Sequence, residues 1–237
     1  NMKIVLVGYG AMGTVVENNV GEDDRIIAVV APEKGVTFAD IKEKPDVIID
    51  FSQPAALDGI CAYAGANGVP TVIATTGYSS AQMDEIKALS AKVPVLFSGN
   101  YSLGVILLNR LVKEVTPILK DTFDIEIIEK HHNKKADAPS GTAKMLINSV
   151  NADGDMNIVY GREGQCKRKK GDVGVHAVRG GTIVGEHQVI YAGTDEVLEL
   201  THYAHSKAIF AKGALRGAHW LVKKPAGLYN MEDVLFN

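Results

Sequence analysis

The chain has 237 residues, with 25 lysines and arginines against 28 aspartates and glutamates, and a formal net charge of −3. This length predicts one two-lobed enzyme or two compact domains, either of which can bury a hydrophobic core. The near balance of charge argues against nucleic acid or an acidic membrane as a partner, and no apolar run approaches the roughly 18 residues that cross a bilayer. The two cysteines form no CxxC pair, which favours reduced thiols in a cytoplasmic protein.

Residues 1–100 alternate between short apolar runs and helix-compatible segments. Strands are expected at 3–7, 26–30, 45–51, 70–74 and 94–97. Helices are expected after a glycine turn through residue 20, from Pro54 to about 65–68, and from a capping box of Ser79 and Gln82 to about residue 92. Strands separated by helices predict right-handed crossovers. The expected fold class is therefore α/β, with a Rossmann-like doubly wound parallel sheet.

The pattern changes after residue 100. A helix is expected at 103–119, a strand at 123–129, and period-two strands at 173–178, 182–192 and 196–203. These elements predict a second α+β lobe with a mixed or antiparallel sheet, followed by a closing helix at 206–222. The Gly-, Lys- and Asp-rich segment 151–172 is expected to be a long surface excursion. We therefore expect a dinucleotide-binding domain at 2–101 plus 208–237, and a substrate-binding and oligomerisation domain at 102–207.

A glycine-rich turn follows the first expected strand, with the sequence Gly8-Tyr9-Gly10-Ala11-Met12-Gly13. In this pattern the first glycine permits a tight turn, the second lets the backbone approach a pyrophosphate, and the third allows close packing of helix on sheet. The following helix offers free backbone amides to phosphates. A glycine turn alone is a weak signal, but its position at the start of a βα series favours binding of NADH or NADPH.

The tip after the second expected strand reads Ala31-Pro32-Glu33-Lys34. An acidic residue directly after this strand usually binds a ribose hydroxyl of the cofactor, and none occupies that position here. Glu33 could reach the ribose and Lys34 could meet a 2′-phosphate, although both could equally be solvated loop charges. The sequence leaves the choice between NADH and NADPH open.

The segment from Glu129 to Ala143, EKHHNKKADAPSGTA, combines acid–base groups, cations and the start of a helix. Pro139 should end any preceding helix, and Ser140 can cap a helix that begins at Gly141 and Thr142. The free amides of that first turn, beside the Thr142 hydroxyl, suit a carboxylate.

Two adjacent histidines in this segment, His131 and His132, should point to opposite sides of an extended backbone. Lys130, Lys134 and Lys135 are expected to hold an anionic substrate and to lower a histidine pKa through like charge. No HExxH spacing or cysteine set is present, so no metal site is predicted. The alternative interpretation is a solvated basic loop with incidental histidines. The same interpretation is preferred for the basic run 167–170, while His176, His187 and His202 receive no role.

The segment 129–143 resembles the signature of the 4-hydroxy-tetrahydrodipicolinate (dihydrodipicolinate) reductase family. The resemblance extends to the motifs at 7–13, 74–77, 98–102, 179–187 and 210–214, and so covers nearly the whole chain. It implies NADH- or NADPH-dependent reduction of 4-hydroxy-tetrahydrodipicolinate to tetrahydrodipicolinate with loss of water, in lysine and diaminopimelate biosynthesis. It also implies a homotetramer and a dicarboxylate as the small-molecule partner.

The resemblance further implies roles for individual residues. His131 resembles the family's catalytic histidine and Lys135 its proton-donating lysine, while His132, Gly141 and Thr142 resemble its substrate-carboxylate contacts. The implied cofactor contacts, besides residues 8–13 and the tip residues Glu33 and Lys34, are Ala74, Thr75, Thr76, Ser98, Gly99, Asn100, Tyr101 and Lys207.

Two features depart from the family pattern. Many relatives have one more residue and an arginine inside the glycine turn, whereas this chain has only Ala11 and Met12 there. Pyrophosphate binding then rests on backbone amides, with a weaker phosphate affinity. The missing acidic residue after the second strand removes the usual ribose contact.

Two other functions compete with the reductase. Another NAD(P)-dependent dehydrogenase acting on an amino or keto acid would share the glycine turn, but it would not explain the paired histidines and Lys135. A non-catalytic dinucleotide-sensing protein would use the same first lobe without chemistry. Binding of NADH without turnover would distinguish it.

Overall fold

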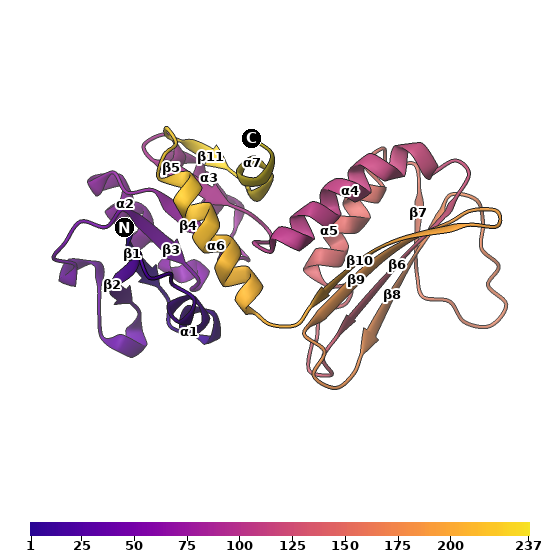
Figure 1. The fold of residues 1–237 in the computed structure, drawn as a ribbon, viewed down its shortest axis with the longest axis horizontal. Helices are drawn as coiled ribbons and strands as arrows, with labels where there is room; N and C mark the ends of the chain where they lie inside the picture. Colours follow the sequence, from indigo (N-terminus) through magenta and orange to yellow (C-terminus); the bar gives the residue numbers. More distant parts are fainter. The chain divides into compact units, whose positions relative to one another are not determined.

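A computed structural model describes residues 1–237 (Figure 1). The chain divides into two compact units. Unit 1 comprises Asn1–Leu103 and Lys207–Asn237, and unit 2 comprises Gly104–Ser206. Unit 2 is thus inserted in sequence between the two segments of unit 1. None of the helices is both long and apolar enough to span a membrane.

Unit 1 contains a six-stranded parallel sheet in the order β11-β5-β4-β3-β1-β2. Its strands are β1 (Lys3–Val7), β2 (Arg25–Val30), β3 (Val47–Asp50), β4 (Thr71–Ile73), β5 (Pro94–Phe97) and β11 (Gly227–Tyr229). The order runs outward in both directions from β1 and β3, which confirms the predicted doubly wound sheet. The short apolar runs form buried strands because helices cover both faces of the sheet.

The helices of unit 1 are α1 (Ala11–Asn18), α2 (Leu57–Asn67), α3 (Ser80–Ser90), α6 (Ala208–Leu221) and α7 (Met231–Phe236). Leu57 and Ile60 of α2 and Ile86 of α3 join one buried cluster with alternate residues of the central strands. On the other face α6 contacts α1, β3, β4 and β5. The predicted capping box at α3 is confirmed, because the Ser79 hydroxyl accepts from the Gln82 amide at 3.2 Å.

Unit 2 contains a five-stranded mixed sheet in the order β10-β9-β6-β8-β7. Its strands are β6 (Asp124–His131), β7 (Asn157–Tyr160), β8 (Asp172–Arg179), β9 (Gly185–Ala192) and β10 (Val197–Ala204). β6 pairs in antiparallel fashion with β9 and in parallel with β8, so the predicted mixed sheet is confirmed. The helices α4 (Leu103–Leu119) and α5 (Gly141–Val150) cover one face, as Figure 1 shows.

Alternation along β6 decides which side chains face these helices. Ile125, Ile127, Glu129 and His131 occupy the buried positions, and the residues between them are partly exposed. The core of unit 2 is apolar up to Ile127 and then becomes polar at Glu129 and His131. A polar pair at the end of a buried strand face is the local feature on which the site in this unit depends.

The prediction that segment 151–172 is only a surface excursion is wrong. It contains β7, which pairs in parallel with β8 from Asn157 to Tyr160. Within the basic run, Arg168 is partly buried and donates to the carbonyls of Ile125 and Asp172 at 2.9 and 2.6 Å, so it is a structural residue. Its neighbours Lys167, Lys169 and Lys170 are exposed, as predicted. The short elements β7, β11 and α7 carry too few residues for a periodic signal.

Two helix glycines give a paired test of this packing. A Cβ at Gly213 in α6 would lie 1.6 Å from the carbonyl oxygen of Tyr101, whereas one at Gly65 in α2 would make only ordinary contacts, the nearest at 3.6 Å. We expect Gly213→Ala to destabilise the protein by about 2 kcal/mol or more, and Gly65→Ala to stabilise it by up to about 1 kcal/mol. Urea unfolding measures both, and equal effects of the two substitutions would contradict this account of α6 packing.

Candidate active site

The pairing register of β1, β3, β4 and β5 aligns the carboxyl ends of these four strands at one edge of the unit 1 sheet. Val7 of β1 lies opposite Asp50 of β3, which lies opposite Ile73 of β4, and Ile73 lies opposite Phe97 of β5. The residues that follow these strands are the predicted cofactor contacts. In open α/β sheets this edge is the usual place for ligands.

The glycine turn after β1 has the backbone geometry that its sequence predicts. Gly8 has φ +93°, and a Cβ there would lie 2.4 Å from the carbonyl oxygen of Phe51. A Cβ at Gly13 would lie 2.6 Å from the carbonyl oxygen of Gly8. Gly10 faces open space and precedes α1 without any side-chain cap, so the amides of the first turn of the helix have no capping partner.

A cavity of about 350 Å³ adjoins this turn. Its lining is drawn from the glycine turn, the tip after β2 and the segment after β3, and comprises Gly8, Tyr9, Gly10, Pro32, Glu33, Phe51, Ser52, Gln53, Ala55 and Ala56. Backbone amides on one side and small or polar residues on the other match the phosphates and ribose of a dinucleotide. The residues present therefore fit NADH or NADPH.

Glu33 and Lys34 lie in a short 3₁₀ helix, Pro32–Lys34, directly after β2. The Lys34 ammonium lies 3.9 Å from the centroid of the Tyr9 ring, a cation–π contact. The Tyr9 hydroxyl donates to Glu17 at 2.7 Å. These contacts bring the tip and the glycine turn together, with Glu33 lining the cavity.

The other predicted cofactor residues differ in what they can offer a ligand. Ala74 to Thr76 follow β4, and Ser98 to Tyr101 follow β5. Thr75 is buried and its hydroxyl accepts from the Ser52 amide at 3.0 Å, whereas Thr76 and Gly99 are exposed. The Tyr101 residue is buried, and its hydroxyl donates to the carbonyl of Ile73 at 2.6 Å. Lys207 is exposed and is the N-cap residue directly before α6.

Unit 2 places Glu129 and His131 side by side at the end of β6. Oε2 of Glu129 lies 2.6 Å from Nδ1 of His131. Glu129 is fully buried and His131 is 9% exposed. Burial alone would raise the pKa of Glu129, but hydrogen bonds from Arg179 and His131 outweigh that effect and lower it.

The segment after His131 folds back onto the turn between β8 and β9. Gly180 donates its amide to the carbonyl of His131 at 3.0 Å, and Asn133 donates to the carbonyl of Gly181 at 3.2 Å. The Lys135 ammonium lies 2.8 Å from Asp137, and this contact is the first cause of the lowered pKa of Asp137. His132 is partly buried and follows the end of the strand.

Ser140 caps α5 as predicted. Its side chain accepts from the amide of Ala143 at 3.1 Å. Gly141 is exposed and Thr142 is partly exposed, both in the first turn of the helix. His131, His132, Lys135 and the start of α5 thus all lie within residues 131–142 of unit 2.

The prediction that Lys130, Lys134 and Lys135 form one cluster is wrong. Lys130 alternates to the opposite face of β6 from His131 and pairs with Glu186 at 3.6 Å. Lys135 pairs with Asp137, and Lys134 is exposed. The charged group next to His131 is the Glu129 carboxylate, not a lysine. A strand residue and a loop residue that are close in sequence need not share a face, which is why the sequence suggested one cluster.

Sequence reasoning missed His187, which joins the same polar pair from β9. Its Nε2 lies 2.8 Å from the Ser140 hydroxyl, and its ring makes an edge contact with His131 at a centroid distance of 5.1 Å. Burial is the main cause, and charge repulsion from the neighbouring His131 the second, of a lowered His187 pKa of about 4. Glu129 and Arg179 were missed as well. A glutamate two residues before a histidine on a buried strand face was the available signal.

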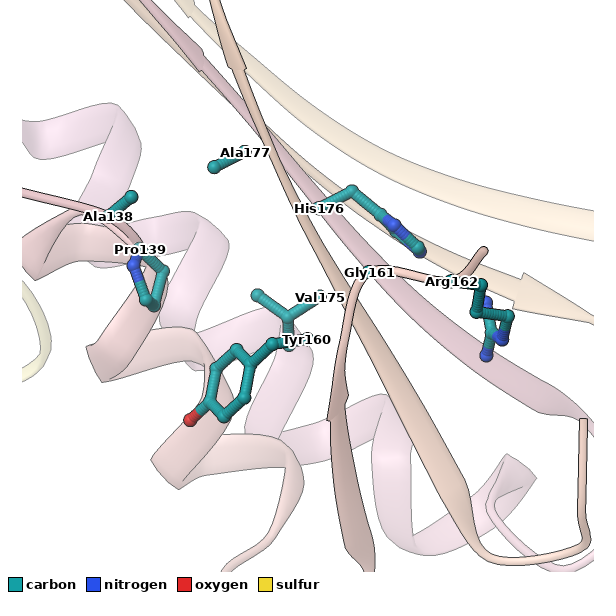
Figure 2. Close-up of a pocket in the computed structure, with 8 residues that line it drawn as sticks. All are labelled: Ala138, Pro139, Tyr160, Gly161, Arg162, Val175, His176 and Ala177. Carbon is teal, nitrogen blue, oxygen red and sulfur yellow. The ribbon is translucent and has the colours of Figure 1, made fainter. Parts of the chain in front are cut away.

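A larger cavity of about 540 Å³ is lined in part by Ala138 and Pro139 (Figure 2). Tyr160, Val175 and Ala177 contribute apolar surface, and Arg162 and His176 contribute polar groups. Both polar side chains bind Glu126, with His176 Nε2 at 3.2 Å from its carboxylate. None of the predicted catalytic residues lines this cavity. No group of three or more histidine, cysteine, aspartate or glutamate side chains is placed to hold a metal ion.

A parallel doubly wound sheet whose first strand leads into a glycine turn and a helix N-terminus is typical of the dinucleotide-binding class of proteins. The family model of the dihydrodipicolinate reductase N-terminus matches residues 2–101, and that of its C-terminus matches residues 104–235. The chain belongs to the dihydrodipicolinate reductase family and is an NAD(P)H-dependent oxidoreductase.

Two relatives agree with this assignment, and a solved structure shares the fold. The chain is 42% identical to the 4-hydroxy-tetrahydrodipicolinate reductase of Clostridium novyi strain NT, covering 98% of each chain. It is also 42% identical to the enzyme of the same name from Brachyspira hyodysenteriae, covering 99% of this chain and 100% of the relative. A dipicolinate-bound dihydrodipicolinate reductase from Paenisporosarcina sp. TG-14 shares the fold, with a TM-score of 0.79, 22% identity and 99% coverage of both chains.

The lowered pKa of His187 predicts a stability change in mild acid. The unfolded chain protonates this histidine near the ordinary histidine pKa of 6.5, whereas the folded protein resists protonation until about pH 4. Stability therefore falls as pH is lowered from 6.5 to about 4, by on the order of 3 kcal/mol from this group. We expect His187→Gln to reduce this fall in urea unfolding at a series of pH values, and His205→Gln, at an exposed loop position, to retain it. An unchanged pH dependence in His187→Gln would contradict the assignment.

Proposed function

We propose that the protein reduces 4-hydroxy-tetrahydrodipicolinate to tetrahydrodipicolinate with loss of water, within diaminopimelate and lysine biosynthesis. The overall reaction consumes one NAD(P)H and one proton and yields NAD(P)⁺ and water. The observation that carries the proposal is membership of the reductase family over both units, together with the grouping of His131, Lys135 and the capped start of α5.

In this proposal the dinucleotide-binding domain comprises residues 2–101 and 208–237, which lie within unit 1. A bound NADH or NADPH supplies the hydride. Amides after Gly10 hold the pyrophosphate, and the tip residues Glu33 and Lys34 meet the adenosine ribose, where Lys34 suits a 2′-phosphate and Glu33 a ribose hydroxyl. Because one charge of each sign lies at the tip, we propose that both cofactors are used. Residues after β4 and β5, with Lys207, surround the nicotinamide.

The substrate-binding domain, residues 102–207, contains unit 2 and is proposed to bind the dicarboxylate substrate. The amides of Gly141 and Thr142 and the Thr142 side chain face one carboxylate at the N-terminus of α5, and the His132 ring provides a further contact. The first turn of α5 contains no acidic side chain that would compete with an anion. Ser140, held by His187, caps the helix by accepting from the Ala143 amide.

Lys135 is proposed as the proton donor. Its ammonium has three N–H groups, and Asp137 accepts from one of them at 2.8 Å, which leaves the others for a ligand. His131, the proposed catalytic histidine, presents its Nε2 to the substrate, since its Nδ1 is bound to Glu129. A proton donor has to reach within about 3 Å of the atom that receives the proton.

We also propose that four copies of the chain assemble in the cytoplasm through the outer face of the unit 2 sheet. Alternation and register place Val178 of β8 and Val197 and Tyr203 of β10 on the face opposite the helices. These side chains are 43%, 59% and 56% exposed in the single chain. Exposed apolar side chains on this face, which also carries polar groups such as Glu126 and Lys130, favour burial against a second copy.

The catalytic roles predict the outcome of a direct assay. A synthase that makes the substrate in place from pyruvate and aspartate semialdehyde lets the absorbance of NADH or NADPH report turnover. We expect wild-type protein to oxidise both cofactors, and His131→Ala and Lys135→Ala each to lower kcat by about 100-fold or more. Lys169→Ala, at an exposed position of the basic run, should retain wild-type kcat. No oxidation by folded wild-type protein would refute the proposed reaction.

The cofactor site predicts a separate result for two open glycines. A methyl group at Gly10 meets no protein atom within 4 Å, and neither does one at Gly21. Only Gly10 lies where the pyrophosphate is proposed to bind. We expect Gly10→Ala to raise the Kd for NADH by about tenfold or more, at unchanged stability, because the methyl group blocks the approach of the phosphates. Fluorescence titration measures this, and a Kd that shifts equally in Gly21→Ala would argue against the site.

The assembly is tested by mass in solution. Light scattering should give about four times the chain mass of 25.4 kDa for wild-type protein. Tyr203→Glu places a charge on the outer sheet face and should lower that mass, because a buried unpaired carboxylate opposes association. Leu228→Glu changes another exposed apolar residue, in unit 1, and should leave the mass unchanged. A wild-type mass near 25.4 kDa would contradict the tetramer.

A further inference from the structure

The buried carboxylate of Glu129 receives hydrogen bonds from three different parts of unit 2. His131 Nδ1 lies 2.6 Å from Oε2, on the same face of the same strand. Arg179, which lies opposite His131 in the β6–β8 register, donates to Oε2 and to Oε1, each at 2.8 Å. The backbone amide of Ser140 donates to Oε1 at 3.1 Å. Every donor to the Glu129 carboxylate therefore either belongs to the proposed site or contacts a residue of that site.

This arrangement determines which nitrogen of His131 carries a proton in the neutral ring. Four hydrogen bonds, two of them from a guanidinium, keep Glu129 ionised, and an ionised carboxylate can only accept. Nδ1 must then be the protonated nitrogen, and Nε2 has the free lone pair. The space beside Nε2 is kept open by Gly185, since a Cβ there would lie 3.1 Å from this nitrogen. His131 thus presents Nε2 as its reactive atom.

Arg179 has a second set of contacts, to the segment that carries Lys135. Its Nε donates to the backbone carbonyl of Lys135 at 3.3 Å, and one terminal nitrogen donates to the carbonyl of Asp137 at 2.8 Å. Asp137 in turn accepts from the Lys135 ammonium. One guanidinium therefore binds the Glu129 carboxylate and the Lys135 backbone at the same time.

We propose that the Glu129–Arg179 ion pair is the positioning unit of this site: Glu129 holds His131 as the Nδ1–H tautomer, and Arg179 holds the backbone of Lys135 against it. The catalytic roles of His131 and Lys135 rest on the proposed function, whereas the tautomer does not. Neither Glu129 nor Arg179 needs to touch the substrate. Such carboxylate–histidine pairs fix ring orientation and tautomer in other catalytic sites.

The same strand contains a second group of similar composition that serves as a control. Glu126 lies on the opposite face of β6 and binds Arg162, the amide of Gly174 at 2.6 Å and His176 at 3.2 Å. Burial would raise its pKa, but the hydrogen bonds from Arg162, His176 and Gly174 lower it to about 2. This group contacts neither His131 nor Lys135. Glu126→Gln therefore removes a partly buried, arginine-bound carboxylate without changing the proposed catalytic residues.

Replacement of Glu129 by glutamine has a defined effect on the tautomer. Oε1 accepts from Arg179 and Ser140, neither of which can become an acceptor, so the amide oxygen of glutamine should occupy this position. The amide nitrogen then faces Nδ1 of His131 and donates to it. This favours the Nε2–H tautomer, in which the reactive nitrogen has lost its lone pair.

The kinetic test compares Glu129→Gln with Glu126→Gln in the coupled assay. We expect Glu129→Gln to lower kcat by about thirtyfold or more, with KM for substrate and cofactor within about threefold of wild type. Glu126→Gln should keep kcat within about threefold. Activity of Glu129→Gln within threefold of wild type, or a loss that matches its unfolded fraction, would overturn the inference.

Nitrogen chemical shifts of ¹⁵N-labelled histidine rings test the tautomer without any turnover. The His131 signals, assigned by their loss in His131→Ala, should report Nδ1–H in wild-type protein and Nε2–H in Glu129→Gln. An unchanged tautomer in Glu129→Gln would overturn the inference. Inactive wild-type protein that still shows this switch would instead refute the proposed reaction alone, so the two failures are distinguishable.

A double variant covers the case in which Glu129→Gln folds poorly because Arg179 has lost its partner. Glu129→Gln with Arg179→Met removes both charges together, and we expect it to fold more stably than the single variant while kcat stays low. Recovery of kcat to within threefold of wild type in the double variant would show that the pair is only structural and would overturn the inference.

Discussion

A buried carboxylate retains its charge only when it has donors, and Glu129 organises its donors into the proposed site. The carboxylate lies fully buried at the point where the apolar core of unit 2 ends. Its hydrogen bonds reach the end of β6, the end of β8 and the start of α5. These hydrogen bonds hold the three elements in one fixed arrangement. The proposed acid–base residues lie at the end of β6 and in the loop that follows it. Loss of the carboxylate would leave the Arg179 guanidinium without its main partner.

Much of the fold was predictable because its signals are local. In unit 1, β1 and β5 were predicted with their final bounds, and the other predicted strands differ by one or two residues at an end. The capping box of α3, the Ser140 cap of α5 and the glycine turn are also local signals, since each involves residues only a few positions apart. Repetition of strand and helix then specifies the parallel sheet, because few chain paths join such elements without crossing.

The site was predictable only in part, because its decisive contacts are distant in sequence. His131, Lys135 and the α5 cap lie in one segment and were identified from it. Arg179 on β8 binds the Glu129 carboxylate, and His187 on β9 binds the Ser140 hydroxyl. Only the sheet register brings these two residues to the site. The three lysines show the opposite error, since their proximity in sequence suggested a cluster that strand alternation separates. Short edge elements such as β7 form through pairing with a neighbour, which a pattern of four residues does not reveal.

The inserted position of unit 2 has a consequence for how the protein forms on the ribosome. Residues 1–103 are synthesised before unit 2, yet α6 and β11, which cover and extend their sheet, belong to residues 207–237. All of unit 2 therefore emerges before unit 1 can be completed. During that interval the sheet face that α6 later covers, with Leu96 and its neighbours, remains without its partner helix. The first part of the chain to be made is thus among the last to reach its native state, and an early stop near the C-terminus would damage the N-terminal sheet and leave the sequence of unit 2 complete.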